Sequence, residues 1–137
     1  MGIGYGGWLA LRAASLNPNL YQGIIADAAP TNIEKYQSYI GDVYGKMSSQ
    51  ALESSHLTDD DRVHASIDPH KLQNSNVLFL GHGLDPLVRF AELDTFSQQL
   101  PVETHTFISL KGEDHELRNP ENRKSYLQLG IIFRNTT

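Results

Sequence analysis

Segments of strand length alternate along this chain with segments of helical periodicity, and this alternation limits the folds open to it. The strand-like segments are short and almost continuously apolar; they are residues 23–29, 76–81 and 102–110. The helix-like segments are residues 5–16, 32–44, 90–100 and 120–134. Such alternation predicts an α/β fold with a parallel sheet. The unbroken apolar strands indicate that helices cover both faces of the sheet.

Proline residues mark two of the expected helix ends. Pro18 ends the first helix, because the residue before a proline disfavours the helical conformation. Pro120 suits the first turn of the last helix. Residues 45–73 carry a weaker pattern rich in Ser, Asp and His. We expect short helices and loops there, with helix starts at 58–61 and at 68–69.

The composition excludes several classes of function. The chain has 137 residues, of which 39% are hydrophobic, and it contains no cysteine. This is the composition of one soluble globular domain. The lack of cysteine excludes a disulfide framework, a thiolate metal site and a cysteine nucleophile. The 11 Lys and Arg against 16 Asp and Glu give a net charge of −5, so nucleic acid is not an expected partner.

Membrane and cofactor roles also find no support in the sequence. No apolar run approaches the length of about 18 residues that a membrane span needs, so no membrane association is expected. No signal peptide is visible, which favours a cytoplasmic location without fixing the compartment. Several histidines show no metal-ligand spacing; they are His56, His64, His70 and His105. We expect neither a metal nor a cofactor.

Three loops lie where an open α/β sheet carries its sites, at the carboxyl ends of the strands. They are residues 2–7, which precede a helix, and residues 81–88 and 111–116, which each follow a strand. In the first loop, Gly6 and Gly7 are expected to let the helix pack closely on the sheet.

Asp85 and His115 stand on the second and third of these loops. Neighbouring strands would bring the two side chains close together. An Asp that accepts from one ring nitrogen leaves the other nitrogen as an acceptor, which makes the His a general base. A nucleophile is then expected on the first loop. Taken alone, Asp85 is also a common type of turn residue, and His115 could be an ordinary surface histidine.

All three loops resemble motifs of the prolyl oligopeptidase family of serine peptidases, which includes dipeptidyl and acylaminoacyl peptidases. Residues 2–9 (GIGYGGWL) resemble the Gly-x-Ser-Tyr-Gly-Gly nucleophile elbow. Residues 82–88 (HGLDPLV) resemble the family's His-Gly-x-x-Asp-x-x-Val loop, one residue shorter before the Asp. Residues 112–115 (GEDH) resemble the segment of the catalytic His. The order nucleophile, Asp, His is that of α/β-hydrolases.

The resemblance implies a partial α/β-hydrolase fold over residues 1–137, the C-terminal portion of a peptidase domain. Three C-terminal parallel strands with flanking helices are expected, without the strands that precede the nucleophile elbow in the family. An unpaired apolar sheet edge is prone to pair with other chains. The chain is therefore expected to be marginally stable alone, or to complete its sheet with another chain or with an N-terminal half.

The resemblance also implies roles for individual residues and a peptide substrate. His115 would be the general base and then the acid, and Asp85 would hold its tautomer. Gly4 stands at the nucleophile position, where Ser is expected. The backbone N–H of Tyr5 would be an oxyanion donor, and Tyr5 and Val88 would line the substrate pocket. Loss of a triad nucleophile commonly costs about a millionfold in rate, so no hydrolase activity is expected.

Other interpretations stay open at this point. The chain could be a non-catalytic remnant that serves as a binding or assembly module, or an ester or thioester hydrolase of the same fold. A dinucleotide-binding loop at residues 2–7 would need a preceding strand and a later acidic residue, for which Asp27 is the only candidate. His82 is expected to be structural in its turn, and Asp114 to orient or solvate its loop. Four aromatic residues are expected to serve packing: Trp8, Tyr36, Tyr39 and Tyr44.

Overall fold

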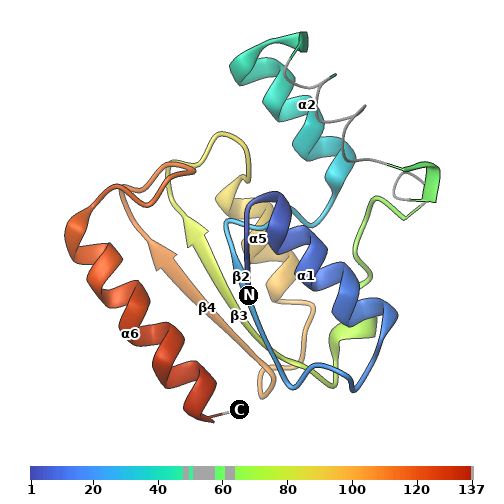
Figure 1. The fold of residues 1–137 in the computed structure, drawn as a ribbon, viewed down its shortest axis with the longest axis vertical. Coiled ribbons are helices and arrows are strands. Elements are labelled where there is room, and N and C mark those ends of the chain that lie inside the picture. Colours follow the sequence, from blue (N-terminus) through green and yellow to red (C-terminus); the bar gives the residue numbers. More distant parts are fainter. Residues whose placement is uncertain (48–49, 51–57, 61–63, 137) are drawn as a thin grey trace.

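The computed structural model describes residues 1–47, 50, 58–60 and 64–136, and its strands form one parallel sheet (Figure 1). The four strands are β1 (Gly2–Ile3), β2 (Gly23–Asp27), β3 (Asn76–His82) and β4 (His105–Leu110), in that spatial order. Each neighbouring pair is parallel. The predicted α/β class with a parallel sheet is confirmed.

Helices connect the strands as the alternation predicts. The named helices are α1 (Tyr5–Leu16), α2 (Ile33–Tyr44), the short 3-10 helix η1 (Pro69–Leu72), α5 (Phe90–Ser97) and α6 (Pro120–Thr136). The bounds of α1 agree with the prediction. The helix start expected at 68–69 is η1, where the Asp68 carboxylate accepts from the backbone N–H of His70 at 2.9 Å. The start expected at 58–61 falls partly outside the described residues.

The helices cover both faces of the sheet. In Figure 1, α1 and α5 lie on one side of the strands and α6 lies on the other. The main buried cluster joins α1 and α5 to β2 and β3, with Trp8, Leu11, Val77, Phe79, Leu93 and Phe96 among its members. Side chains alternate along a strand, so the buried Leu78 and Leu80 face the α6 side. This two-sided burial explains why β3 is an unbroken apolar run.

Glycine permits the close contact between α1 and the sheet. A Cβ on Gly7 would lie 2.5 Å from the Cβ of Ala29, and a Cβ on Gly2 would lie 2.0 Å from the carbonyl oxygen of Gly6. Gly6 itself has nothing within 4 Å of such a Cβ. The expected close approach is therefore correct for Gly7 and wrong for Gly6, which faces open space.

The sheet differs from the sequence prediction in its number of strands and in the strand ends; the strand predicted at 23–29 ends at Asp27, and the one predicted at 76–81 extends to His82. A fourth strand is present, because Gly2 and Ile3 pair with Ala26 and Asp27 of β2 just before the helix begins. The last strand starts at His105 and not at residue 102. Val102 lies in a turn and is 77% exposed, since the N–H of Thr104 donates back to the carbonyl of Pro101 at 3.0 Å.

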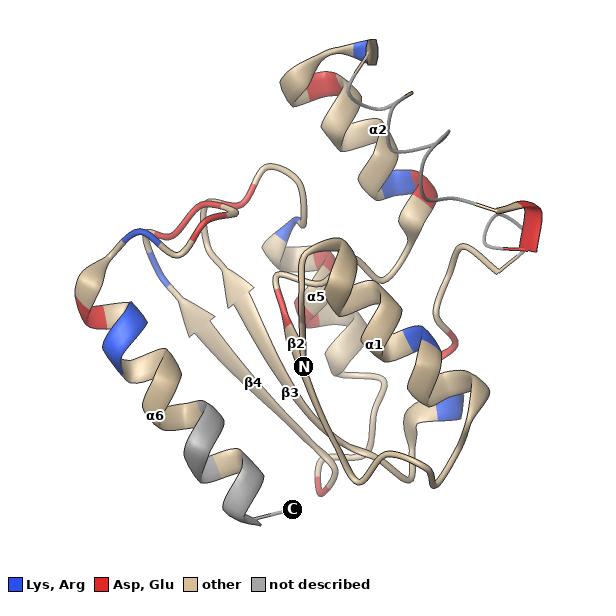
Figure 2. Cartoon of the chain, viewed as in Figure 1, with Lys and Arg blue, Asp and Glu red and all other residues tan. Residues whose placement is uncertain are grey.

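Charges are spread unevenly over this framework. Lys and Arg are scattered along several elements, whereas acidic residues gather in the loop between β4 and α6 (Figure 2). Within the described part of the chain, no helix has both the length and the apolar character to cross a membrane. The same residues contain no group of three or more His, Cys, Asp or Glu that could hold a metal ion.

Candidate active site

A single residue, Gly4, separates strand β1 from helix α1. Its backbone has φ 55° and ψ −126°, in the left-handed range of φ that favours glycine. Its N–H donates to the carbonyl of Asp27 at 2.9 Å, and its own carbonyl accepts from Gly7 and Trp8 at 2.9 and 3.2 Å. These hydrogen bonds hold a sharp strand-to-helix turn at the carboxyl end of the sheet.

Asp85 lies in the loop that follows β3, and its carboxylate is fully buried. One oxygen, Oδ1, accepts from the backbone N–H groups of Leu87 at 2.8 Å and Val88 at 2.9 Å. The other oxygen, Oδ2, lies 2.8 Å from Nδ1 of His115. The local turn therefore fixes the carboxylate and presents its second oxygen to the histidine.

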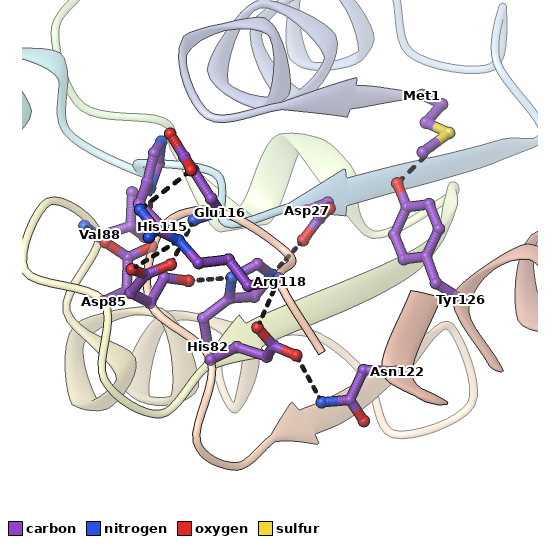
Figure 3. A network of polar contacts seen from close by, with 12 residues as sticks. Met1, Asp27, His82, Asp85, Val88, His115, Glu116, Arg118, Asn122 and Tyr126 are labelled. Atoms are coloured by element: carbon purple, nitrogen blue, oxygen red, sulfur yellow. Dashed lines mark hydrogen bonds and ion pairs between the residues drawn. The ribbon is translucent and has the colours of Figure 1, made fainter. Parts of the chain in front are cut away.

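His115 lies in the loop that follows β4, and its side chain is 20% exposed. Its Nδ1 donates to Asp85, which leaves Nε2 as an acceptor (Figure 3). Nε2 lies 2.9 Å from the position that a Cβ on Gly4 would occupy, so the ring must shift slightly to admit a side chain there. The structure thus brings together all three positions that the sequence singled out, Gly4, Asp85 and His115.

Tyr36 on α2 also borders this group, although the sequence assigned it only to packing. Its hydroxyl lies 3.6 Å from the Cβ position on Gly4, and its ring centroid lies 6.1 Å from that of His115. Burial, followed by the charge of Asp85 and by Tyr44, raises the pKa of Tyr36 to about 12. Its phenol stays neutral and can donate a hydrogen bond. The sequence pattern carries no signal for this position, because the distance from Tyr36 to Gly4 depends on how α2 is oriented against the sheet.

A small hollow of about 10 Å³ lies between α2 and the loop that carries Asp85. Its lining includes Pro30, Tyr36, Val88 and Glu92. This volume holds about one water molecule. Val88 lines this hollow, and its role in a substrate pocket stays a prediction. Tyr5 does not line this hollow; its ring stacks on Trp8 with the centroids 5.8 Å apart.

Buried polar groups support the loop that carries His115. Glu113 accepts from the N–H groups of Arg118 and Asn119 at 2.9 and 3.0 Å, and from the amide of Asn122 at 2.7 Å. Asp114 accepts from the N–H of Glu116 at 2.9 Å, in keeping with an orienting role. The loop between β4 and α6 is thus tied internally on both sides of His115.

A parallel sheet flanked by helices, a sharp turn from strand to helix, and an Asp and a His on the loops after β3 and β4 define the class of the α/β-hydrolases. Among families of this class, the model of the Prolyl oligopeptidase family matches residues 1–134. The chain belongs to the prolyl oligopeptidase family, whose members are serine-type hydrolases.

Solved structures show the same fold at low sequence identity. A puromycin-hydrolysing peptidase of Mycobacterium tuberculosis is 19% identical, with a TM-score of 0.77 over 99% of this chain and 21% of its own. An acylaminoacyl peptidase of Pyrococcus horikoshii is 16% identical, with a TM-score of 0.68 over 96% of this chain and 22% of its own. A monoacylglycerol lipase of Paleococcus ferrophilus is 15% identical, with a TM-score of 0.65 over 95% of this chain and 65% of its own.

The chain spans only part of these similar proteins, 21% and 22% of the two peptidases and 65% of the lipase. A comparison with curated protein sequences gives no match. The fold and the family are therefore established, and the activity has to be argued from the site itself.

Proposed function

We propose that this chain keeps the base and the orienting acid of a peptidase-type triad but performs no hydrolysis, because Gly4 occupies the nucleophile position. The observation that carries the proposal is the direction of His115. Its Nε2, held in place through Asp85, lies 2.9 Å from where the Cβ of a nucleophile at position 4 would be.

The chemistry of a triad shows what glycine removes. In a serine hydrolase the hydroxyl proton moves to Nε2 of the His, and the serine oxygen attacks the substrate carbonyl carbon to form an acyl-enzyme. Gly4 supplies neither the oxygen nor the proton, so no acyl-enzyme can form. The backbone N–H of Tyr5 and the hydroxyl of Tyr36 would still face a carbonyl oxygen bound there.

The substrate class that fits the site is a peptide or other acyl compound. The family supports the peptide, and the hollow that Tyr36 and Val88 line beside the site is the place where the group next to the carbonyl would lie. In the absence of cleavage, the site would bind such a compound and release it unchanged.

The test compares the wild type with a Gly4→Ser variant in the hydrolysis of an activated amino-acyl ester and of a peptide amide. We expect no turnover from the wild type above buffer, and measurable ester turnover from Gly4→Ser. A Gly4→Ser/His115→Ala double variant should return to the buffer rate. Turnover by the wild type that a serine-directed phosphonate blocks would overturn the proposal.

A second candidate function is that of a non-catalytic binding or assembly module. The exposed side chains of Met1 and Ile3, next to edge strand β1, favour it, because such an edge can accept another chain. Binding of a peptide at the site would shift the NMR signals of His115 and Tyr36. Assembly through the edge would leave those signals unchanged and would raise the molecular mass with protein concentration.

A further inference from the structure

Asp27, at the end of β2, connects the Gly4 turn to a second buried histidine. Its backbone carbonyl accepts from the N–H of Gly4 at 2.9 Å. Its carboxylate Oδ1 lies 2.7 Å from Nε2 of His82, at the end of the neighbouring strand β3. Asp27 is 2% exposed and His82 is 1% exposed, so water does not screen this pair.

The other ring nitrogen of His82 reaches the loop that carries His115. Nδ1 of His82 contacts the backbone carbonyl oxygen of Asp114, the residue directly before His115 (Figure 3). A continuous path therefore runs from the Gly4 turn through Asp27 and His82 to His115. The path ends at Gly4 and at His115. The distance between these two residues decides whether a nucleophile at position 4 could pass its proton to the histidine.

Both partners of the His82 ring are acceptors. A carbonyl oxygen can only accept, and an ionised carboxylate can only accept, so both ring nitrogens must carry a proton. His82 is then an imidazolium with a positive charge inside the protein. His115 differs, because the contact described for its ring is with one acceptor, the Asp85 carboxylate at Nδ1.

The surroundings of His82 favour this charge. Burial alone would lower the pKa of His82, but the hydrogen bonds to Asp27 and to the Asp114 carbonyl, together with the charges of Asp27 and Asp85, outweigh burial and raise it. Glu113 also faces the ring, since the charge of His82 contributes to the lowered pKa of Glu113. From α6, Tyr126 faces Asp27; burial, and then the charge of Asp27 and a hydrogen bond to it, raise the pKa of the phenol.

We propose that His82, as a buried imidazolium paired with Asp27, is a positioning residue that sets the distance between the Gly4 turn and His115. A neutral imidazole carries a single N–H and cannot donate to both the Asp27 carboxylate and the Asp114 carbonyl. Its loss would free the loop at the residue next to His115. The inference rests on the proposed function for the role of His115, but its test reads the histidine rings and not hydrolysis.

Nitrogen NMR of the ¹⁵N-labelled chain tests the charge directly. At a pH just above the ordinary histidine pKa of about 6.5, we expect both ring nitrogens of His82 to be protonated in most molecules, because its pKa is raised. In an Asp27→Asn variant, His82 should titrate at a lower pH. One unprotonated nitrogen on His82 of the wild type at that pH would overturn the inference.

The positioning role is tested on His115. In a His82→Gln variant we expect the proton shared by His115 and Asp85 to exchange at least about tenfold faster with water, because the loop is no longer held. His70→Gln is the matched control and should leave this proton unchanged. If His82→Gln does not fold, Asp27→Asn gives the same readout. An unchanged His115 proton in the folded variant contradicts the role, whatever the outcome of the hydrolysis assay.

Discussion

At the scale of single residues, the two histidines in this site differ in what their ring nitrogens face. His115 meets one carboxylate, that of Asp85 at 2.8 Å, and keeps a nitrogen free to accept. His82 meets a carboxylate on one side and a carbonyl oxygen on the other. We therefore propose different roles for the two histidines, a base for His115 and a fixed donor for His82.

Glu113 makes the stability of this region depend on pH. The hydrogen bond from Asn122 lowers its pKa most; burial opposes this, and the N–H groups of Arg118 and Asn119 and the charge of His82 lower the pKa further. A carboxyl group with a lowered folded pKa stabilises the fold above its unfolded value of 4.5, and this stabilisation is lost as the pH falls through the folded pKa.

Urea unfolding over a series of pH values checks this effect. We expect the wild type to lose stability below about pH 4.5, and Glu113→Gln, which cannot ionise, to show a smaller loss over the same range. Glu103→Gln is the control, because Glu103 is exposed, and it should follow the wild type. If Glu113→Gln follows the wild-type pH profile, the assignment to Glu113 is wrong.

At the scale of elements, the sequence predicted which helices and strands are present better than it predicted the residues at which they begin and end. Helix α1 has the predicted bounds, because its periodic apolar residues stop at a proline-containing turn. Strand β1 was missed, because two residues carry no periodic pattern and pair only through the register of β2. Val102 continued the alternation of β4 in the sequence, but the turn at Pro101 holds it outside the strand.

In the candidate site, residues in local sequence motifs could be predicted, whereas contacts between distant segments could not. Gly4, Asp85 and His115 could be predicted because each lies in a recognisable loop at the end of a strand. Tyr36 could not, since its distance to Gly4 depends on how α2 leaves the sheet. The link between His82 and Asp27 spans 55 positions in the sequence and follows only from the pairing of β2 with β3.

The packing of α1 against the sheet predicts opposite effects at two adjacent glycines. Gly7→Ala would place a methyl group 2.5 Å from the Cβ of Ala29, so we expect a loss of about 1–3 kcal/mol in the free energy of unfolding. Gly6→Ala meets nothing within 4 Å and should be neutral or stabilising by up to about 1 kcal/mol. Chemical denaturation of the two variants measures their free energies of unfolding. Equal effects of Gly7→Ala and Gly6→Ala would contradict the packing described for α1.

At the scale of the whole molecule, the chain presents a sheet with an open edge. In the described residues β1 pairs with β2 alone, and Ile3 on this edge strand is 55% exposed. The chain spans about a fifth of the two similar peptidases. Completion of the sheet by another chain or by further family segments stays a proposal.

Association through this edge has a direct test. We expect the isolated chain to form larger species as its concentration rises in sedimentation experiments, and Ile3→Lys to suppress them, because a charge on an edge strand opposes strand pairing. Leu84→Lys is the control, since Leu84 is exposed in a loop away from β1 and should not change the association. Equal suppression by both variants would point to general solubility and contradict an interface at β1.

The central proposal is that Asp85 and His115 are placed to activate a nucleophile at position 4, which Gly4 lacks, and labelling by a fluorophosphonate tests it most directly. The wild type, Gly4→Ser and Gly6→Ser would be treated in parallel, and the modified residue located by mass spectrometry of peptides. The account predicts an adduct on position 4 of Gly4→Ser and none on the wild type or on Gly6→Ser, whose new hydroxyl faces open space. Labelling of Gly4→Ser no faster than of Gly6→Ser would contradict it, because His115 would then not be placed to activate a nucleophile at position 4.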